Sequence, residues 1–281
     1  MQEFERRELV EIAVEAVQEG GRLIREAFAR PRGGEVQKGA IDLVTETDGA
    51  VEALLRQRLV ARTGFAFLGE EEGASGAVQE GGYVWIVDPI DGTTNFAHRV
   101  PYLATSVGLW GPEGAIVGVI YNPVFDELFV SDGRTARLGD AALPQLAYQP
   151  LERSLLVTGF PYDRQTNPDN NVMECHALLM RTRGVRRLGA AALDMAWLAA
   201  GRFDGFWEPT LQPWDVVAGL ALLSAVGGVA TNYSGDPWTL EHRTLIAGHP
   251  QRVAELRSIL AELRQGSGLP LDLPDRDKVQ R

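Results

Sequence analysis

Apolar residues recur at helical spacing through the first part of the chain. Over about residues 3–29 they return every three to four positions, which is the pattern of one buried side of an α-helix. Pro31 follows, and proline interrupts helical hydrogen bonding, so we predict one long amphipathic helix that ends before it. Residues 45–48 have the sequence of a helix-capping box, which predicts a second, short helix behind them.

Short runs rich in aromatic and β-branched residues replace the helical period after residue 64, and such runs are typical of strands. Two of these runs stop at acidic residues, at residues 70–72 and at Asp88. A hairpin with a third strand follows, and then strands and helices alternate. The predicted strands are 65–68, 83–87, 106–110, 116–121, 128–130, 154–158, 203–207, 229–231 and 245–247, and the later helices cover about 172–182, 191–200, 215–225 and 251–263.

This order of elements predicts a single catalytic domain of mixed α/β class over residues 1–281. An α+β half covers residues 1–150 and an α/β half covers residues 151–264. Residues 132–150 have no strong period. Residues 265–281 are rich in Gly, Pro and charged side chains, and we predict that they form a flexible tail.

Composition excludes several classes of protein. The chain has 281 residues, 45% hydrophobic and 23% charged, as in an ordinary globular domain rather than a disordered or collagenous chain. Its formal net charge of -11 argues against nonspecific nucleic-acid binding, which depends on cationic groups. No apolar run is long enough to span a membrane. The only cysteine, Cys175, and an amino terminus unlike a secretory signal predict a cytoplasmic protein.

The sequence DPIDGTTN at residues 88–95 carries the candidate chemistry. Asp88 and Asp91 flank a proline turn at the end of a predicted strand, and Gly92 lets backbone N–H groups approach a ligand closely. Mg²⁺ prefers carboxylate oxygens together with phosphate oxygens, so we interpret this stretch as a site for a metal-bound phosphate. The same two acids would equally suit an Asx turn that caps the next element.

Other acidic residues favour the metal interpretation. Glu70 and Glu71 end the preceding strand, and Asp215 begins a buried apolar helix, where an unpaired carboxylate would be costly. Asp215 alone would also suit the N-terminal cap of that helix. The combination of these acids, rather than any one of them, therefore points to a metal site.

Three motifs in this order resemble the inositol monophosphatase family: GEE at residues 69–71, DPIDGTTNF at 88–96 and WDVVAG at 214–219. Residues 42–48 and 203–208 are similar to two further segments of that family, so the resemblance spans most of the chain. It implies a layered αβαβα sandwich of the α+β type that fructose-1,6-bisphosphatase shares. It also implies a magnesium-dependent, lithium-sensitive phosphomonoesterase.

By matching positions, the resemblance implies two Mg²⁺ ions and a third that binds weakly. Glu70, Asp88 and the carbonyl of Ile90 would hold one ion, and Asp88, Asp91 and Asp215 would hold the second. About four carboxylate charges are cancelled by two such ions, so the site repels a phosphate dianion when empty and accepts it when metallated.

The resemblance also implies roles in catalysis. Glu70 and Thr93 would orient the attacking water, while Asp91 and Asp215 hold the ion that stabilises the leaving alkoxide. The backbone amides of Gly92, Thr93 and Thr94 are the candidates for binding phosphate. Asp48, Glu71 and Lys38 are candidates for supporting or third-metal roles, and the alternative is that they are ordinary solvated charges.

Two further positions concern the leaving group. Glu208 matches a family contact to sugar or cyclitol hydroxyls, and the backbone near Ala191 matches another. Alanines at 190–192 and the bulky residues 160–162 replace hydroxyl side chains of some relatives, which weakens the case for strict inositol specificity. myo-Inositol 1-phosphate is the leading substrate, and the alternatives are fructose 1,6-bisphosphate, histidinol phosphate, NADP and adenosine bisphosphate.

The predicted partner is therefore a small-molecule phosphate monoester, with no nucleic acid and no membrane. The family suggests a homodimer. A non-catalytic regulatory protein that has kept the fold is the alternative from another class. Loss of a metal ligand or of Thr93 would favour that alternative, and the sequence retains all of them.

Overall fold

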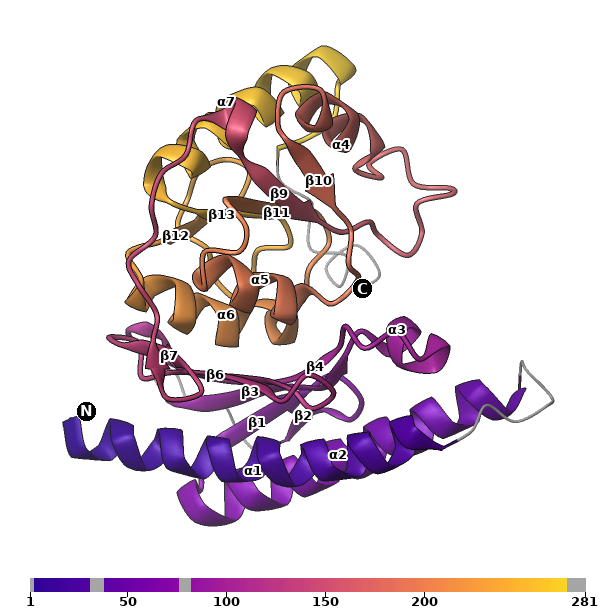
Figure 1. Cartoon of the computed structure of the whole chain (residues 1–281), viewed down its shortest axis with the longest axis vertical. Helices are drawn as coiled ribbons and strands as arrows, with labels where there is room; N and C mark the ends of the chain where they lie inside the picture. The colour runs from indigo at the N-terminus through magenta and orange to yellow at the C-terminus, as the bar shows by residue number, and fades with distance from the viewer. Residues whose placement is uncertain (1–2, 31–37, 76–81, 272–281) are drawn as a thin grey trace. The chain divides into compact units, whose positions relative to one another are not determined.

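The residues of the chain group into two compact units. The computed structural model describes residues 3–30, 38–75 and 82–271 (Figure 1). The first unit consists of Met1–Leu143 with Gly189–Ala196 and Trp214–Ala225, and the second consists of Pro144–Leu188, Trp197–Pro213 and Val226–Arg281. Two segments of the C-terminal half thus belong to the first unit, so no single cut along the sequence separates the two units.

The first unit is built on a mixed sheet. Among the described residues its strands run in the order β2-β1-β3-β4-β5-β6-β7-β8, and only β1 and β3 are parallel neighbours in it. The strands are β1 (Ala66–Gly69), β2 (Gly73–Ser75), β3 (Val84–Asp91), β4 (Ala104–Gly111), β5 (Gly114–Asn122), β6 (Glu127–Ser131), β7 (Ala136–Leu138) and β8 (Ala141–Ala142). The helices of this unit are α1 (Glu3–Ala29), α2 (Lys38–Thr63), α3 (Thr93–His98), α6 (Pro213–Ala225) and the first residues of α5 (Ala191–Ala199).

Helices cover both faces of this sheet (Figure 1). The apolar sides of α1 and α2 lie on one face and form a common core with residues such as Phe67, Trp85 and Val107. The α6 backbone lies on the other face, so close that a Cβ at Gly118 would overlap the carbonyl of Ala218. The central strands are therefore buried on both sides, which explains why they read as continuous apolar runs.

The second unit is built on a smaller sheet with the strand order β10-β9-β11-β13-β12. β9 is parallel to β10 and β11, whereas β13 is antiparallel to both of its neighbours. Side chains of Leu156, Trp207, Ile246 and Leu256 form its core. The elements are a 3₁₀ turn (Leu151–Arg153), β9 (Leu155–Thr158), α4 (Val172–Leu179), β10 (Gly184–Arg186), β11 (Gly205–Glu208), β12 (Val229–Thr231), β13 (Leu245–Gly248) and α7 (Pro250–Ser267).

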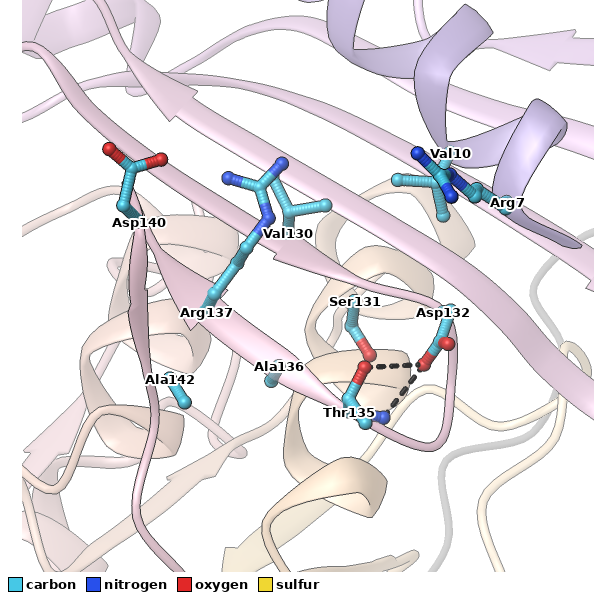
Figure 2. A pocket seen from close by; sticks show the side chains of 10 residues that line it. All are labelled: Arg7, Val10, Val130, Ser131, Asp132, Thr135, Ala136, Arg137, Asp140 and Ala142. Carbon is cyan, nitrogen blue, oxygen red and sulfur yellow. Dashed lines mark hydrogen bonds between the residues drawn. The ribbon is translucent and has the colours of Figure 1, made fainter.

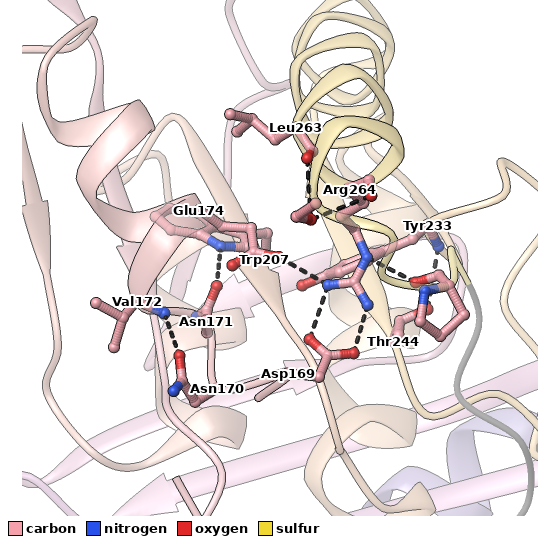
Figure 3. Close-up of polar contacts among 12 residues, drawn as sticks. Asp169, Asn170, Asn171, Val172, Glu174, Trp207, Tyr233, Thr244, Leu263 and Arg264 are labelled. Carbon is pink, nitrogen blue, oxygen red and sulfur yellow. Dashed lines mark hydrogen bonds and ion pairs between the residues drawn. The ribbon is translucent and has the colours of Figure 1, made fainter. Parts of the chain in front are cut away.

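A buried ion-pair cluster, Arg264 with Asp169 and Glu174, joins α7 to the segment before α4 and to α4 itself (Figure 3). Arg264 is fully buried and donates to Asp169 Oδ1 at 2.8 Å and to Glu174 Oε1 at 2.7 Å, with a second bond to Asp169 Oδ2. Its guanidinium also lies 5.1 Å from the centre of the Tyr233 ring. The protein thus pairs these two buried acids with a cation of its own.

The mixed α/β class is confirmed, and the differences from the predicted elements lie at element ends and in four short strands. α2 begins at Lys38, so residues 45–48 lie inside this helix and are not a capping box, because packing against α1 and the sheet overrides a local signal. β2, β7, β8 and β10 have no predicted counterpart, since two or three residues carry no measurable period.

The C-terminal helix is longer than its pattern predicts. α7 continues to Ser267 and ends at Gly268, which has a left-handed φ of 72°, so residues 265–267 are helical. Residues 272–281 of the predicted tail lie outside the described part of the chain. No helix among the residues described combines the length and apolar character needed to cross a membrane.

Candidate active site and metal centre

Strand β3 carries Asp88 and Asp91 at the end of a fully buried run. In a regular strand, side chains three positions apart point to opposite faces of the sheet. The pairing of β3 with β4 is irregular between these two residues. Pro89 has no N–H to donate there, and its carbonyl accepts a 2.9 Å hydrogen bond from Thr105 Oγ1 instead. This irregularity brings both carboxylates to one place.

Asp215 reaches the same place from the first turn of α6, a distant part of the sequence. Ser106, which pairs with Asp88 on the neighbouring strand, donates to the Trp214 carbonyl at 3.2 Å and ties the start of α6 to the sheet. One carboxylate oxygen from each of Asp88, Asp91 and Asp215 lies within 4.8 Å of the others. We call these three residues the acidic cluster.

The short helix α3 starts directly after the acidic cluster, at Gly92. Gly92 has a φ of 93°, and a Cβ there would lie 3.1 Å from the Tyr102 carbonyl oxygen, so glycine is required on both counts. Thr93 is half-buried, and its hydroxyl donates to the carbonyl of Ile90 at 3.2 Å. Thr94 is exposed. The turn therefore holds the predicted Thr93 and Ile90 groups next to each other.

Asp91 also holds the N-terminus of α5. Its Oδ1 accepts a hydrogen bond from the Ala191 amide at 2.9 Å, and its Oδ2 accepts one from the Leu193 amide at 3.1 Å. The Ala191 backbone, which the sequence analysis assigns to substrate, is thus bonded to Asp91 through its N–H. Both oxygens of Asp91 are fixed in direction before any ligand binds.

Glu70 follows β1 at the tip of the β1–β2 hairpin and is exposed on one side. Its amide donates to the Val87 carbonyl at 3.2 Å, which places it beside the residue before Asp88. Partial withdrawal from water raises the pKa of Glu70, with the charges of Glu71 and Glu52 acting in the same direction, while a hydrogen bond with Asp88 acts against it. Glu70 is therefore linked to the acidic cluster through Asp88.

The carboxyl groups of this region have raised pKa values because they are buried and repel one another. Burial and then the charge of Asp215 raise the pKa of Asp91 to about 8, against the bonds from the Leu193 and Ala191 amides. Burial and then the charge of Glu70 raise the pKa of Asp88 well above its usual range. Like charges gathered in this way are stabilised either by a bound cation or by the uptake of protons.

The supporting residues of the sequence analysis fall in three different situations. Asp48 is buried, and desolvation together with Glu71 and Glu70 raises its pKa to about 8. Glu71 is exposed, and desolvation together with Glu52 raises its pKa. Lys38 is the first residue of α2, but its side chain lies outside the described part of the structure.

The donor set fits a divalent metal ion. Buried oxygens of Asp48 and Asp88, both named Oδ1, have no hydrogen-bond donor within the described residues. Such atoms are costly to bury unless a donor or a cation contacts them. All candidate ligand atoms here are oxygens, which suit a hard cation better than a metal that prefers thiolate ligands.

Glu52 is a residue of this region that the sequence analysis did not select. It is fully buried on α2 and accepts hydrogen bonds from the amides of Glu71 and Glu72 at 2.9 and 3.0 Å. A signal for it is present in the sequence, because Asp48 and Glu52 are four residues apart on the same helical side as the buried Val51. Acids on the apolar side of a helix are costly to bury unless hydrogen bonds or an opposite charge compensate them.

Glu208 belongs to the second unit and ends β11. A Cβ at Gly159 would overlap its carboxylate, so glycine lets this carboxylate lie directly against the chain. Asn171 fixes this end of the sheet, since it donates to Thr158 Oγ1 and the Gly159 carbonyl at 2.8 and 2.6 Å and accepts from Trp207 Nε1 at 2.7 Å.

A hollow of about 660 Å³ lies elsewhere in the first unit, lined by α1 and strands β6 to β8 (Figure 2). None of the predicted site residues lines it. Its two arginines are already engaged, Arg7 with Glu11 at 3.1 Å and Arg137 with the carbonyl of Gly139. The acidic cluster, where like charges lie close together, is therefore a better candidate for a ligand site than this hollow.

The sequence as a whole matches a family model described as the inositol monophosphatase family over residues 5–267. The chain belongs to the inositol monophosphatase family. This membership makes it a phosphatase, a hydrolase of phosphate esters, in a family that depends on metal ions.

Individual relatives agree with this assignment. An inositol-1-monophosphatase of Rhizobium meliloti is 38% identical over 256 residues, which is 90% of this chain and 96% of that protein. The solved structure of an inositol monophosphatase from Anabaena (Nostoc) has a TM-score of 0.82 at 37% identity, over 92% of this chain and 96% of that one. A Pseudomonas aeruginosa protein named Nus factor SuhB is 39% identical over 86% of this chain and 91% of that protein.

Proposed function

We propose that the protein is a magnesium-dependent phosphomonoesterase of small polyol phosphates, with myo-inositol 1-phosphate as the leading substrate. The observation that carries this proposal is the convergence of Asp88, Asp91 and Asp215 from distant segments, in a chain of this family. Oxygen donors on a partly buried acidic surface are typical of sites where a hard divalent cation holds a phosphate.

Two sets of ligands would hold the cations. Glu70, Asp88 and the carbonyl of Ile90 form the first set, and Asp88, Asp91 and Asp215 form the second. The hydrogen bond from Thr93 to the Ile90 carbonyl supports the first set, because it fixes the direction of that oxygen. The amide bonds to Asp91 do the same for the second. A third, weaker site would use the neighbouring acids Asp48 and Glu71.

Cations held by these residues would supply positive charge to the phosphate and lower the pKa of water. The side chains of the protein orient the reactants. The Thr93 hydroxyl donates a hydrogen bond to the Ile90 carbonyl, so its oxygen lone pairs would accept a hydrogen bond from the attacking water. Glu70 accepts the proton that this water releases. The amides of Gly92, Thr93 and Thr94 would bind phosphate oxygens, and the leaving alkoxide takes a proton from water, so that hydrolysis yields an alcohol and inorganic phosphate.

The substrate is the less constrained half of the proposal. Glu208 would offer a carboxylate that accepts hydrogen bonds from polyol hydroxyls, whereas Ala191, Phe160 and Pro161 offer no side-chain hydroxyl to a cyclitol. We therefore propose preference for a polyol or sugar phosphate without strict selection of inositol.

Phosphate release from a panel of esters tests the proposal. The panel contains inositol 1-phosphate, fructose 1,6-bisphosphate, histidinol phosphate, NADP and adenosine 3',5'-bisphosphate, each with Mg²⁺, with chelator, and with added lithium. We expect Mg²⁺-dependent, lithium-inhibited turnover that is highest for inositol 1-phosphate. If only another ester were hydrolysed, that ester would replace inositol 1-phosphate as the proposed substrate. Turnover that persists in the presence of chelator would overturn the metal assignment.

A non-catalytic binding role is the second candidate, and the relative named Nus factor SuhB is the observation that keeps it in view. The two functions are separable. Protein that binds Mg²⁺ but hydrolyses no ester of the panel would favour the binding role. Turnover would favour the enzyme.

We also propose that the protein is a cytoplasmic homodimer. Support for a dimer comes from large exposed apolar side chains in the second unit, among which Tyr162 is 89% and Met180 72% exposed, with Val172 and Leu179 also exposed. The cytoplasmic assignment has the support of the single, half-buried Cys175. The mass measured by light scattering, with Met180→Glu as the comparison, tests the dimer.

A further inference from the structure

Glu52 is an acid buried beside other acids, and its hydrogen bonds explain why. The side chain is 0% exposed on α2. Its Oε2 accepts from the Glu71 amide at 2.9 Å and its Oε1 accepts from the Glu72 amide at 3.0 Å. One carboxylate thereby holds two consecutive backbone N–H groups at the tip of the β1–β2 hairpin, the segment that also contains Glu70.

Arg56 neutralises this carboxylate and adds further contacts to the hairpin. It lies one helical turn after Glu52 and donates to Glu52 Oε1 at 3.0 Å. Its other terminal nitrogen contacts Glu72 Oε2 at 2.9 Å, and its guanidinium lies 4.8 Å from the centre of the Phe67 ring on β1. The arginine is thus fixed on three sides, which keeps the Glu52 carboxylate in one orientation.

The backbone is shaped to admit the Glu52 carboxylate. A Cβ at Gly69, the residue before Glu70, would overlap the carboxyl group of Glu52. Gly73, which pairs with Gly69 across the hairpin, has a left-handed φ of 72° that closes the three-residue tip. Glycine at both positions lets the tip fold tightly over α2.

Glu70 is consequently held from both sides. Its own amide donates to the Val87 carbonyl on β3 at 3.2 Å, and the next two amides donate to Glu52. The backbone at Glu70 therefore has a fixed place relative to β3, one residue from Asp88. Its side chain remains exposed on one side.

We propose that Glu52, held by Arg56, is a positioning residue that sets the place of Glu70 relative to Asp88 and thereby the affinity of the site for divalent cations. The inference rests on the proposed metal-dependent function. It adds that α2, which contributes none of the proposed ligands of the two main cations, determines how well the first of the two is bound. Residues of this kind typically contribute about 10- to 100-fold in metal affinity or activity.

The test compares Glu52→Gln with the wild-type protein. The amide keeps the size of the side chain but presents an NH₂ group to one of the two backbone N–H groups, so it holds only one of them. We expect the Kd for Mn²⁺, measured by calorimetry without substrate, to rise about 10- to 100-fold. We also expect saturating Mg²⁺ to restore most of kcat, because the ligands themselves are unchanged.

A matched control lies on the neighbouring helix. Glu19 on α1 pairs with Arg58 on α2 at 2.7 and 2.8 Å without touching the hairpin, so Glu19→Gln removes an acid bound to the same helix. Its Kd for Mn²⁺ should equal that of the wild type. Arg56→Lys provides a milder variant if Glu52→Gln does not fold, and it should weaken Mn²⁺ binding in the same direction.

Unchanged Mn²⁺ affinity in folded Glu52→Gln or Arg56→Lys protein would overturn the inference. An equal loss in Glu19→Gln would overturn it as well, since the effect would then be a general one of charge. Failure of the proposed function has a different signature, which is wild-type protein that binds Mn²⁺ but releases no phosphate. In that case the ratio of Kd values still decides the role of Glu52.

Discussion

The acidic cluster and the ion-pair cluster both place carboxylates inside the protein, but they differ in where the compensating charge comes from. In the ion-pair cluster, Arg264 bonds to Asp169 and Glu174 within 2.8 Å, and all three side chains are buried. In the acidic cluster, the charges that dominate the pKa values of Asp88 and Asp91 are those of other carboxylates.

This difference separates a structural use of buried charge from a functional one. A buried acid that is paired with an arginine of the same chain has a partner for its charge in the folded state and needs no ligand. Buried acids that raise one another's pKa have their charge compensated only when a cation binds or when they take up protons. The comparison therefore predicts that mutation in the acidic cluster changes activity, whereas mutation in the ion-pair cluster changes stability.

The largest expected effect is that of Asp91→Asn on turnover. The change removes one ligand charge at constant shape, and metal ions supply several kcal/mol of transition-state stabilisation, so kcat should fall by more than about 100-fold. The thermal midpoint of metal-free protein should fall by a smaller amount, because the new amide accepts from only one of the two backbone N–H groups that Asp91 holds. Steady-state kinetics and calorimetry measure the two quantities, and a variant that keeps most of its activity would show that the ligand assignment is wrong.

Arg264→Met should have the next largest effect, and on stability. It leaves Asp169 and Glu174 buried without their cation, which costs about 3–5 kcal/mol in the free energy of unfolding. Urea unfolding measures the loss. Replacing both acids by leucine in the same chain should recover most of it, since a buried ion pair and a well-packed apolar group are often similar in stability. A failure to recover would mean that Arg264 acts through more than these two acids.

The pH dependence of the stability of metal-free protein should be a smaller effect than the loss in Arg264→Met. Its sign should be opposite to that of an ordinary salt bridge. Asp48 and Asp91 have pKa values of about 8, raised from 3.8, so the folded state keeps protons that the unfolded chain releases. Below pH 3.8 the two states bind the same protons, and between pH 3.8 and 8 the stability falls as pH rises. Thermal unfolding in chelator measures this slope, and added Mg²⁺ should remove it while releasing protons. A flat profile without metal would contradict the raised pKa values.

The smallest effect is expected for Glu19→Gln. Glu19 is hydrogen-bonded to Arg58 at the surface, which lowers its pKa, so its contribution is present above the ordinary value of 4.5 and is lost as pH falls. Solvent and salt screen such a pair, and the midpoint of urea unfolding at neutral pH should not change measurably. A shift as large as that of Arg264→Met would remove the distinction between buried and exposed pairs.

Much of the fold could be predicted from periodicity. The long first helix, the strands that end near Glu70 and Asp88, and the buried helix behind Asp215 are all strong, sustained patterns. The start of α2 could not be predicted, because residues 45–48 carry a local capping signal that packing overrides. Four short strands, β2, β7, β8 and β10, were also not predicted, since two or three residues carry too little period and their pairing defines them.

The candidate site was predictable as a list of acids but not as an arrangement. The motifs bring Glu70, Asp88, Asp91 and Asp215 to attention through their residue types and their order. They do not say that an irregular pairing turns Asp88 and Asp91 the same way, or that Asp91 holds the amide of Ala191. They also miss Glu52, whose role exists only through backbone groups that lie beside it in the fold.

The sequence by itself determined the class of the protein, its family and the chemical type of its site, because these depend on residue identity and spacing along the chain. Only the tertiary structure decided which acids lie close to one another and which share an arginine. The physical reason is that electrostatic and hydrogen-bond energies depend on separations of a few ångströms. Residues distant in the sequence, such as Asp91 and Asp215 or Asp169 and Arg264, acquire those separations only when the chain folds.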